Sequence, residues 1–194
     1  MMATIFKGSF IVIVFLTIVS AGCTPPAKPL YLCPSFHEEW IDEIVVLPVV
    51  DLRFGEAKDL DLDSLVQTVV EDALCAKNYA VKVCTDRSLI THVSESIFLR
   101  EDVNALKRIG PTGCRWVILI ALHASSTREI GDSEGSADMT ALFIDKRRGR
   151  TVWRDKAVSR HKRGGVLGVL SKGSVEELAV SGAAETVMKS FPKR

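Results

Sequence analysis

The chain has 194 residues, and its 25 basic side chains nearly balance its 24 acidic ones. Because nucleic-acid-binding proteins usually carry an excess of positive charge, a net charge of +1 gives no sign of nucleic-acid binding. The length and the 47% of hydrophobic residues allow one ordinary domain with a substantial core.

The first 22 residues have the three-part layout of an export signal. Lys7 comes first, an apolar run covers residues 10–19, and small residues end at Gly22. A membrane-spanning helix needs about 20 apolar residues, and this run is shorter even when it is counted generously. Residues 1–22 therefore predict a targeting signal rather than a membrane anchor.

Residues 19–23, VSAGC, resemble the lipobox of bacterial lipoproteins, in which the cysteine is acylated and the signal is removed just before it. The last three positions match, whereas Ser20 stands where a leucine-like residue is usual. The resemblance implies cleavage between Gly22 and Cys23 and attachment of fatty acid, such as palmitate, at Cys23. Several acyl chains would hold the protein at a membrane surface. The alternative is an ordinary secretory signal that precedes a cysteine.

The residues after Cys23 are expected to form a tether. In lipoproteins of this kind an aspartate at the next position favours the inner membrane, so Thr24 implies the outer membrane, with the protein facing the periplasm. Residues 24–36 contain four prolines, which favour extended chain. We therefore expect an acylated, proline-rich tether over residues 23–42 and one periplasmic domain over residues 43–191.

The first half of this domain alternates between strand and helix patterns. Residues 43–50 predict a buried strand, and Pro48 indicates that pairing stops there or that the strand lies towards an edge. Apolar residues at helical spacing follow over 62–76, with Asp61 as the expected N-cap and Asn78 as a left-handed stop.

The middle of the chain continues this alternation. Residues 79–84 predict a second strand, and the polar residues 85–98 predict a connection with one helical turn. Residues 99–110 predict a short amphipathic helix that ends at Gly110. Residues 115–123 form a continuous apolar run, which is typical of a central strand in a sheet covered on both faces.

The second half predicts antiparallel pairing. Polar residues 124–136 predict a loop, and two strand-like segments over 137–145 and 150–160 are joined in the manner of a hairpin. Ser174 and Glu177 form a capping box ahead of a final helix. The order β-α-β-α-β-β-β-α predicts a single α/β (α+β) domain, with a mixed sheet of about five strands and helices packed on it.

Charge is distributed unevenly along the chain. Residues 38–63 hold nine acidic and two basic side chains, whereas residues 145–163 hold nine basic and two acidic ones. The second segment predicts a basic face for anionic lipid, phosphate or an acidic partner. The residues of this face are Arg147, Arg148, Arg150, Arg160, Lys162 and Arg163. The alternative is that the two segments neutralise each other.

The cysteines other than Cys23 form an even set, Cys33, Cys75, Cys84 and Cys114, in a compartment that permits disulfides. Four cysteines allow three sets of pairings, and the sequence alone does not choose among them. A bridge between Cys75 and Cys114 is expected, because the first long helix should run back against the parallel strands and end near the start of the strand that follows Cys114.

No motif of a catalytic nucleophile, a metal site or a cofactor site is present, and the four histidines are isolated in the sequence. The glycine-rich stretch over 163–174 lacks the ending of a phosphate-binding loop. It predicts a crossover that docks on the domain, touches lipid or contacts another subunit.

Four segments are similar to a superfamily of small bacterial envelope lipoproteins, which includes the curli-secretion channel lipoprotein and the N-terminal domain of TolB. These segments are IVVLPVVD (44–51), VEDALCAKNYAVKV (70–83), IGPTGCRWVILIAL (109–122) and IDKRRGRTVWR (144–154). The resemblance implies an adaptor or a subunit of a larger envelope assembly. The channel-forming members cross the membrane with long apolar hairpins, and the polar residues 124–136 argue against a pore here.

These observations favour a non-enzymatic, membrane-anchored adaptor or accessory subunit that contacts other envelope proteins. An alternative is a homo-oligomeric subunit of a secretion or transport assembly, with residues 163–173 at the contact between subunits. The sequence gives less support to an envelope hydrolase.

Overall fold

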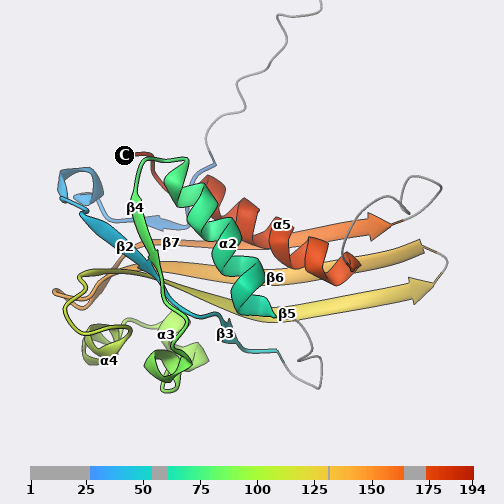
Figure 1. Cartoon of the computed structure of the whole chain (residues 1–194), viewed down its shortest axis with the longest axis horizontal. Helices are drawn as coiled ribbons and strands as arrows, with labels where there is room; N and C mark the ends of the chain where they lie inside the picture. The colour runs from blue at the N-terminus through green and yellow to red at the C-terminus, as the bar shows by residue number, and fades with distance from the viewer. Residues whose placement is uncertain (1–26, 54–60, 131, 164–173) are drawn as a thin grey trace, which may run out of the picture.

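The computed structural model describes residues 27–53, 61–130, 132–163 and 174–194. These residues form one seven-stranded mixed sheet with four α-helices packed against it (Figure 1). The strand order is β1-β7-β6-β5-β2-β4, and the short strand β3 also pairs with β5. The predicted α/β (α+β) domain with a mixed sheet is therefore confirmed, with two more strands than expected.

The elements have the following bounds. The strands are β1 (Tyr31–Leu32), β2 (Glu43–Val46), β3 (Val50–Asp51), β4 (Ala80–Val83), β5 (Trp116–Ile130), β6 (Asp132–Asp145) and β7 (Arg150–Arg163). The α-helices are α2 (Leu62–Cys75), α3 (Glu95–Leu99), α4 (Val103–Arg108) and α5 (Val175–Lys189), and the 3-10 helices are η1 (Phe36–Glu38) and η2 (Arg87–Ile90). Within the described residues, no helix is both long enough and apolar enough to cross a bilayer.

Strand β5 lies at the centre of the sheet and joins its two halves. It pairs in parallel with β2 and β3, and in antiparallel fashion with β6, which in turn pairs with β7. Alternate side chains of a strand point to opposite faces. Ile118 and Ile120 pack with the core that includes α2 and α5, whereas Val117 and Leu119 pack with the core that includes α3 and α4. All four are fully buried, as expected for a strand covered on both faces.

The predicted boundaries of the first long helix, α2, are confirmed. Asp61 accepts a hydrogen bond from the Ser64 amide at 3.1 Å and caps α2, and Asn78 has a positive φ of 67° beyond the end of the helix. The break between β2 and β3 contains Pro48, and the amide next to it, that of Val49, donates to Asp63 Oδ1 at 2.7 Å. Pairing therefore stops at this proline in the interior of the sheet.

The predicted loop over residues 124–136 is wrong. Strand β5 continues to Ile130 and β6 begins at Asp132, so these polar residues form two paired strands. Antiparallel backbone hydrogen bonds do not require apolar side chains, and this part of the hairpin is further supported by β7, which pairs with β6 as far as Ser133. The hairpin turn between β6 and β7 occurs where the sequence predicts it.

The final helix also starts where the sequence predicts. Ser174 Oγ accepts from the Glu177 amide at 3.1 Å, and Glu177 Oε2 accepts from the Ser174 amide at 2.6 Å, which completes the capping box. A Cβ atom at Gly135 of β6 would lie 2.2 Å from the Val175 carbonyl oxygen. Glycine at this position therefore lets the first turn of α5 lie directly on β6.

The segment between β4 and β5 holds more helix than the one turn that the sequence predicts around residues 88–93. Helix α3 follows η2, and α4 confirms the expected short amphipathic helix, with Leu106 and Ile109 fully buried. Val103, expected on the same face, is 48% exposed.

The described part of the expected tether packs on the domain. Strand β1 pairs with β7, and the Cys33 amide donates to the Val152 carbonyl at 2.8 Å. The side chains of Cys33, Phe36 and Ile41 are buried in the core beneath α2 and α5. The folded domain thus begins near residue 31 rather than at residue 43, because apolar side chains among the prolines find places in the core.

Phe191, just after α5, is at the centre of an aromatic cluster that joins both ends of the described chain. Its ring lies 5.9 Å from that of Phe36, 5.5 Å from Tyr79, 5.3 Å from Phe143 and 5.0 Å from Trp153.

We therefore expect Phe191→Ala to lower the free energy of unfolding by about 3–5 kcal/mol, through lost burial and the cavity left behind. The measurement is urea unfolding followed by circular dichroism. Lys193→Ala, two residues further on and exposed, is the matched control and should change stability little. Equal stability of the two variants would contradict the assigned role of Phe191.

Candidate functional site

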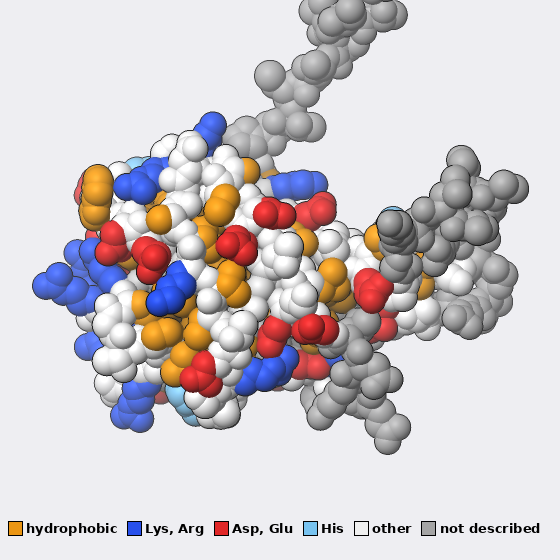
Figure 2. Space-filling model, viewed as in Figure 1, with side chains coloured by type: hydrophobic (Ala, Val, Ile, Leu, Met, Phe, Trp, Pro, Cys, Tyr) orange, Lys and Arg blue, Asp and Glu red, His pale blue; other side chains and the backbone are white. Residues whose placement is uncertain are grey.

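A basic pocket lies at the end of the sheet where β5 begins and β6 ends. Its volume is about 490 Å³, and five cationic side chains line it with no carboxylate among the lining residues. The lining residues are Lys107, Arg108, Gly110, Thr112, Gly113, Cys114, Arg115, Lys146 and Arg147. Figure 2 shows Lys and Arg side chains gathered at this end of the molecule, over α4 and the β6–β7 turn.

Lys146 is the buried cation of the basic pocket, at 8% exposure. Its ammonium donates hydrogen bonds to the carbonyl oxygens of Pro111 at 2.6 Å and Gly110 at 3.2 Å. Gly110 has a positive φ of 75°, which shapes the connection from α4 to β5. Among the residues that the structure describes, no carboxylate forms an ion pair with Lys146, so its full charge contributes to the basic character of the pocket.

An ionic cluster lies next to the basic pocket and shares Arg115 with it. It consists of two carboxylates, Glu39 and Asp145, and three arginines, Arg115, Arg148 and Arg150. The Asp145 side chain is fully buried and accepts from Arg115 at 2.9 Å and from Arg148 at 3.0 Å. Glu39 accepts from Arg115 at 2.7 Å, from Arg150 at 3.0 Å and from Arg148.

The ionic cluster shifts the titration of its members. Burial acts to raise the pKa of Asp145, but hydrogen bonds from Arg115 and the charges of Arg115 and Arg148 outweigh it, so this pKa lies below its ordinary value. The pKa of Glu39 is lowered in the same way, against an opposing effect of burial. The Asp145 and Glu39 carboxylates, against an opposing effect of burial, raise the pKa of the Arg115 guanidinium. Glu39, Asp145 and Arg115 are therefore charged at neutral pH.

The structure divides the basic face that the sequence predicts. Arg147 lines the basic pocket, whereas Arg148 and Arg150 pair with Glu39. Arg160 stands ten residues further along β7 than Arg150, a distance of about 33 Å in an extended strand.

At that far end of β7, Lys162 lies 3.7 Å from Glu134, and Arg163 is the last residue of the strand. The six residues therefore do not form one patch, because the length of β7 separates Arg147, Arg148 and Arg150 from Arg160, Lys162 and Arg163. For Glu39, the alternative that the acidic and basic segments neutralise each other is correct.

Sequence reasoning missed four members of the basic pocket, namely Lys107, Arg108, Arg115 and Lys146. A signal was present, because Lys107 and Arg108 end a predicted helix and Arg115 begins the next predicted strand. Antiparallel pairing of β5 with β6 then places the end of β6, with Lys146 after it, beside the start of β5. The register between these strands, which the sequence does not supply, was the missing information.

The expected Cys75–Cys114 bridge is not formed. Cys75 is the last residue of α2, exposed and free, whereas Cys114 packs against the core formed by α3 and α4 on the opposite face of the sheet. Cys33 and Cys84 are also free. Gly22, Cys23 and residues 164–173 lie outside the described residues, so the lipobox and the glycine-rich stretch have no structural description.

A second polar cluster lies near the N-terminal end of α5. Arg53, 5% exposed in its side chain, donates to Ser125 Oγ at 2.9 Å and to Glu176 at 3.2 Å, and pairs with Asp51 at 2.8 Å. Ser125 also donates to Glu176. These contacts attach the first turn of α5 to β3 and β5, so the cluster has a structural role.

The histidines do not form a metal site in the described residues, where no suitable group of three ligands occurs. His123 bonds Thr140 Oγ1 at 2.9 Å and lies against the Phe98 ring, which accounts for it as a structural residue.

No family model matches this chain, and no curated protein is a significant match. Among solved structures, the PelC dodecamer from Paraburkholderia phytofirmans is 14% identical, with a TM-score of 0.48, covering 77% of this chain and 88% of that one. Lipoprotein GNA1162 from Neisseria meningitidis is 17% identical, with a TM-score of 0.46, covering 75% and 96%. A minor lipoprotein from Acinetobacter baumannii is 8% identical, with a TM-score of 0.40, covering 78% and 91%. Likenesses at this level carry no argument about function.

The lowered pKa values of Glu39 and Asp145 predict acid sensitivity. Their contribution to stability is fully present above the ordinary carboxyl range, at about pH 4, and is lost as the pH falls through the lowered values. We expect Asp145→Asn to cost about 2–3 kcal/mol at pH 7, because it removes the charge-assisted hydrogen bonds that Arg115 and Arg148 donate to a fully buried carboxylate.

The measurement is the urea midpoint of the wild type, of Asp145→Asn and of the control Asp72→Asn between pH 7 and pH 2. Asp72 is exposed, so its variant should follow the wild type throughout. A variant at Asp145 that kept the full acid dependence of the wild type would show that the cluster is not responsible.

Proposed function

We propose that this chain is a lipid-anchored bacterial envelope protein that works as a non-enzymatic adaptor and binds an acidic partner in its basic pocket. The anchor is the acylated Cys23, and Thr24 favours the outer membrane with the domain in the periplasm. The observation that carries the adaptor role is the basic pocket itself, five cations around a cavity of about 490 Å³.

The chemistry of the basic pocket suits carboxylate or phosphate groups. Arginine and lysine donate charge-assisted hydrogen bonds, and several cations around one concave surface attract anions and orient them. Lys107, Arg108 and Arg147 are exposed and free to reach a partner, whereas Lys146 is fixed by its carbonyl contacts. A fixed cation surrounded by mobile ones supports selective binding of a protruding acidic side chain or a similar group.

The ionic cluster supports this proposal by holding Arg115 in place. The Arg115 guanidinium forms ion pairs with Glu39 and Asp145. Its central carbon lies 4.1 Å from the centre of the Trp116 ring. Because these contacts restrain the start of β5, a partner does not have to order this wall of the pocket when it binds.

The proposed anchor predicts that Cys23→Ala leaves the protein without fatty acid and free in the periplasm. The measurement is labelling of cells with radioactive palmitate, followed by separation of membranes from soluble periplasm. The control is Cys75→Ala, which removes an exposed thiol of the domain and should remain labelled and membrane-bound. Unchanged membrane association of Cys23→Ala would contradict the anchor.

The proposed binding site predicts that Lys107→Glu with Arg147→Glu weakens binding of an acidic peptide at least tenfold, because two attractive charges become repulsive. The probe is a fluorescent decaglutamate peptide, and its anisotropy is measured in low and high salt. Salt should weaken the wild-type interaction, since the charges are solvent-accessible.

The matched control is Arg160→Glu with Lys162→Glu, which makes the same change of net charge at the far end of β7. This control should retain most of the affinity for the peptide. Equal loss in both double variants would assign the binding to overall charge and would overturn the pocket as the site.

A further inference from the structure

The exposed apolar side chains of the domain are concentrated near its N-terminal end. Six large hydrophobic side chains of the described residues are exposed, and three of them, Leu30, Tyr31 and Trp40, fall within the first 14 residues that the structure describes. Trp40 is the most exposed of the six, at 74%. Trp40 lies beside Lys193 and Arg194, and we call Trp40, Lys193 and Arg194 together the N-terminal aromatic patch.

Trp40 is displayed from a rigid segment. Its carbonyl oxygen accepts a hydrogen bond from the Trp116 indole at 3.2 Å, and the flanking Ile41 side chain is buried, as is Phe36 earlier on the segment. Glu39, directly before it, belongs to the ionic cluster. The backbone is thus held from both sides while the indole ring points outward, so the exposure of the ring is a feature of the fold.

Basic groups surround the exposed ring. The Arg194 guanidinium lies 5.0 Å from the centre of the Trp40 ring, and the Arg194 amide donates to the Lys77 carbonyl at 3.3 Å. Burial, together with the nearby charge of Lys193, lowers the pKa of Lys77. An aromatic ring beside cations is the composition typical of protein surfaces at the membrane–water interface. Glu38 and Asp42 on the same segment are exposed as well, so charge alone does not define this surface.

The length of chain before the patch limits where it can lie. Three residues separate Cys23 from residue 27, where the described chain begins, and these four residue-to-residue steps cover about 14 Å in extended chain. Leu30 lies at most about 25 Å along the chain from Cys23. A domain held by an acylated Cys23 therefore has this side close to the bilayer, whatever conformation the intervening residues adopt.

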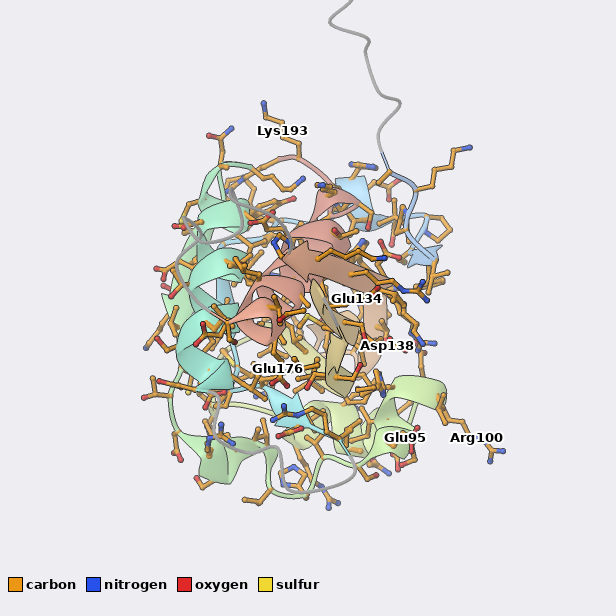
Figure 3. The ribbon with its side chains drawn as sticks, turned by 90° about the vertical axis from the view of Figure 1, so that its right-hand side faces the viewer. Glu95, Arg100, Glu134, Asp138, Glu176 and Lys193 are labelled. Atoms are coloured by element: carbon orange, nitrogen blue, oxygen red, sulfur yellow. The ribbon has the colours of Figure 1, made fainter. Side chains whose placement is uncertain are left out.

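The figures agree with this orientation. Figure 1 places the start of the described chain, η1 and the C-terminus on the same upper side of the molecule, with α4 on the lower side. Figure 3, turned by 90°, keeps Lys193 at the top and Arg100 near the bottom. Helix α4, which helps to line the basic pocket, therefore lies on the side away from the one where the chain enters.

We propose that the N-terminal aromatic patch rests on the bilayer that holds the acyl chains, with Trp40 in the headgroup region and Lys193 and Arg194 against anionic headgroups. This inference rests on the proposed lipid anchor and adds an orientation to it. The domain lies against the membrane, with helix α4 on its far side.

The test uses the acylated, full mature chain reconstituted into vesicles of zwitterionic and anionic phospholipid, in which part of the lipid is brominated to quench tryptophan. Trp116 and Trp153 are buried and serve as an internal reference. We expect quenching and a blue shift of the exposed component of the emission. Trp40→Phe should abolish both changes, which identifies their source.

A charge variant distinguishes direct contact of the patch with lipid headgroups from a domain that is only held near the bilayer. Lys193→Glu should reduce the quenching in anionic vesicles, whereas Arg100→Glu, an equal charge change on the opposite side, should not. Flotation of the vesicles reports the anchor independently. Protein that floats with its vesicles but shows no quenching of Trp40 overturns the inference and leaves the anchor intact. The same conclusion holds where quenching is absent because a second copy of the chain covers the patch. Failure to float removes the anchor and the inference together.

Discussion

The basic pocket and the segment that carries Trp40 both depend on one constraint, the fully buried carboxylate of Asp145. Removing a carboxylate from water costs several kcal/mol, and here Arg115 and Arg148 offset that cost with direct hydrogen bonds. Both arginines also bind Glu39, which precedes Trp40. One ionic cluster thus fixes the wall of the basic pocket and the segment that displays the indole ring.

Sharing of the arginines couples the two surfaces. A change at Glu39 would remove the carboxylate partner of Arg150 and one of the two partners of Arg148, and would loosen the backbone of Trp40 at the same time. Groups in one network of ion pairs are not independent, and their contributions to stability do not add. The proposed adaptor site and the proposed membrane contact are therefore parts of one arrangement of charges.

Local patterns predicted the parts of the fold that local interactions determine. Helix α2 has Asp61 and Asn78 at its ends, α5 has its capping box, and the parallel and antiparallel halves follow from the alternation of strands and helices. The polar half of the β5–β6 hairpin could not be predicted. Its strands are joined by hydrogen bonds between backbones, which do not require a pattern of apolar side chains that the sequence would reveal.

The candidate site was predicted only in part, since it depends on contacts between distant residues. The composition of residues 145–163 indicated a basic surface, but the length of β7 separates Arg147 from Arg160. The pairing of β5 with β6 brings Lys146 beside Arg115. The prolines before residue 36 favoured a free tether, and the burial of Phe36 and the pairing of β1 depend on positions offered by α5 and β7. The expected disulfide was wrong for the same reason, because the helix and the cysteine before β5 lie on opposite faces.

The pairing of β1 with β7 has a mechanical consequence for a domain held at its N-terminus. Any pulling force along the chain enters through Tyr31 and Leu32 of the edge strand β1, whose two register partners lie on the neighbouring strand β7. Beyond them the load reaches the Cys33 amide, bonded to Val152, and then the salt bridges of Glu39. A force applied at the N-terminus is thus taken first by the short strand β1 and by the buried side chains of Cys33 and Phe36, ahead of the ion pairs of Glu39.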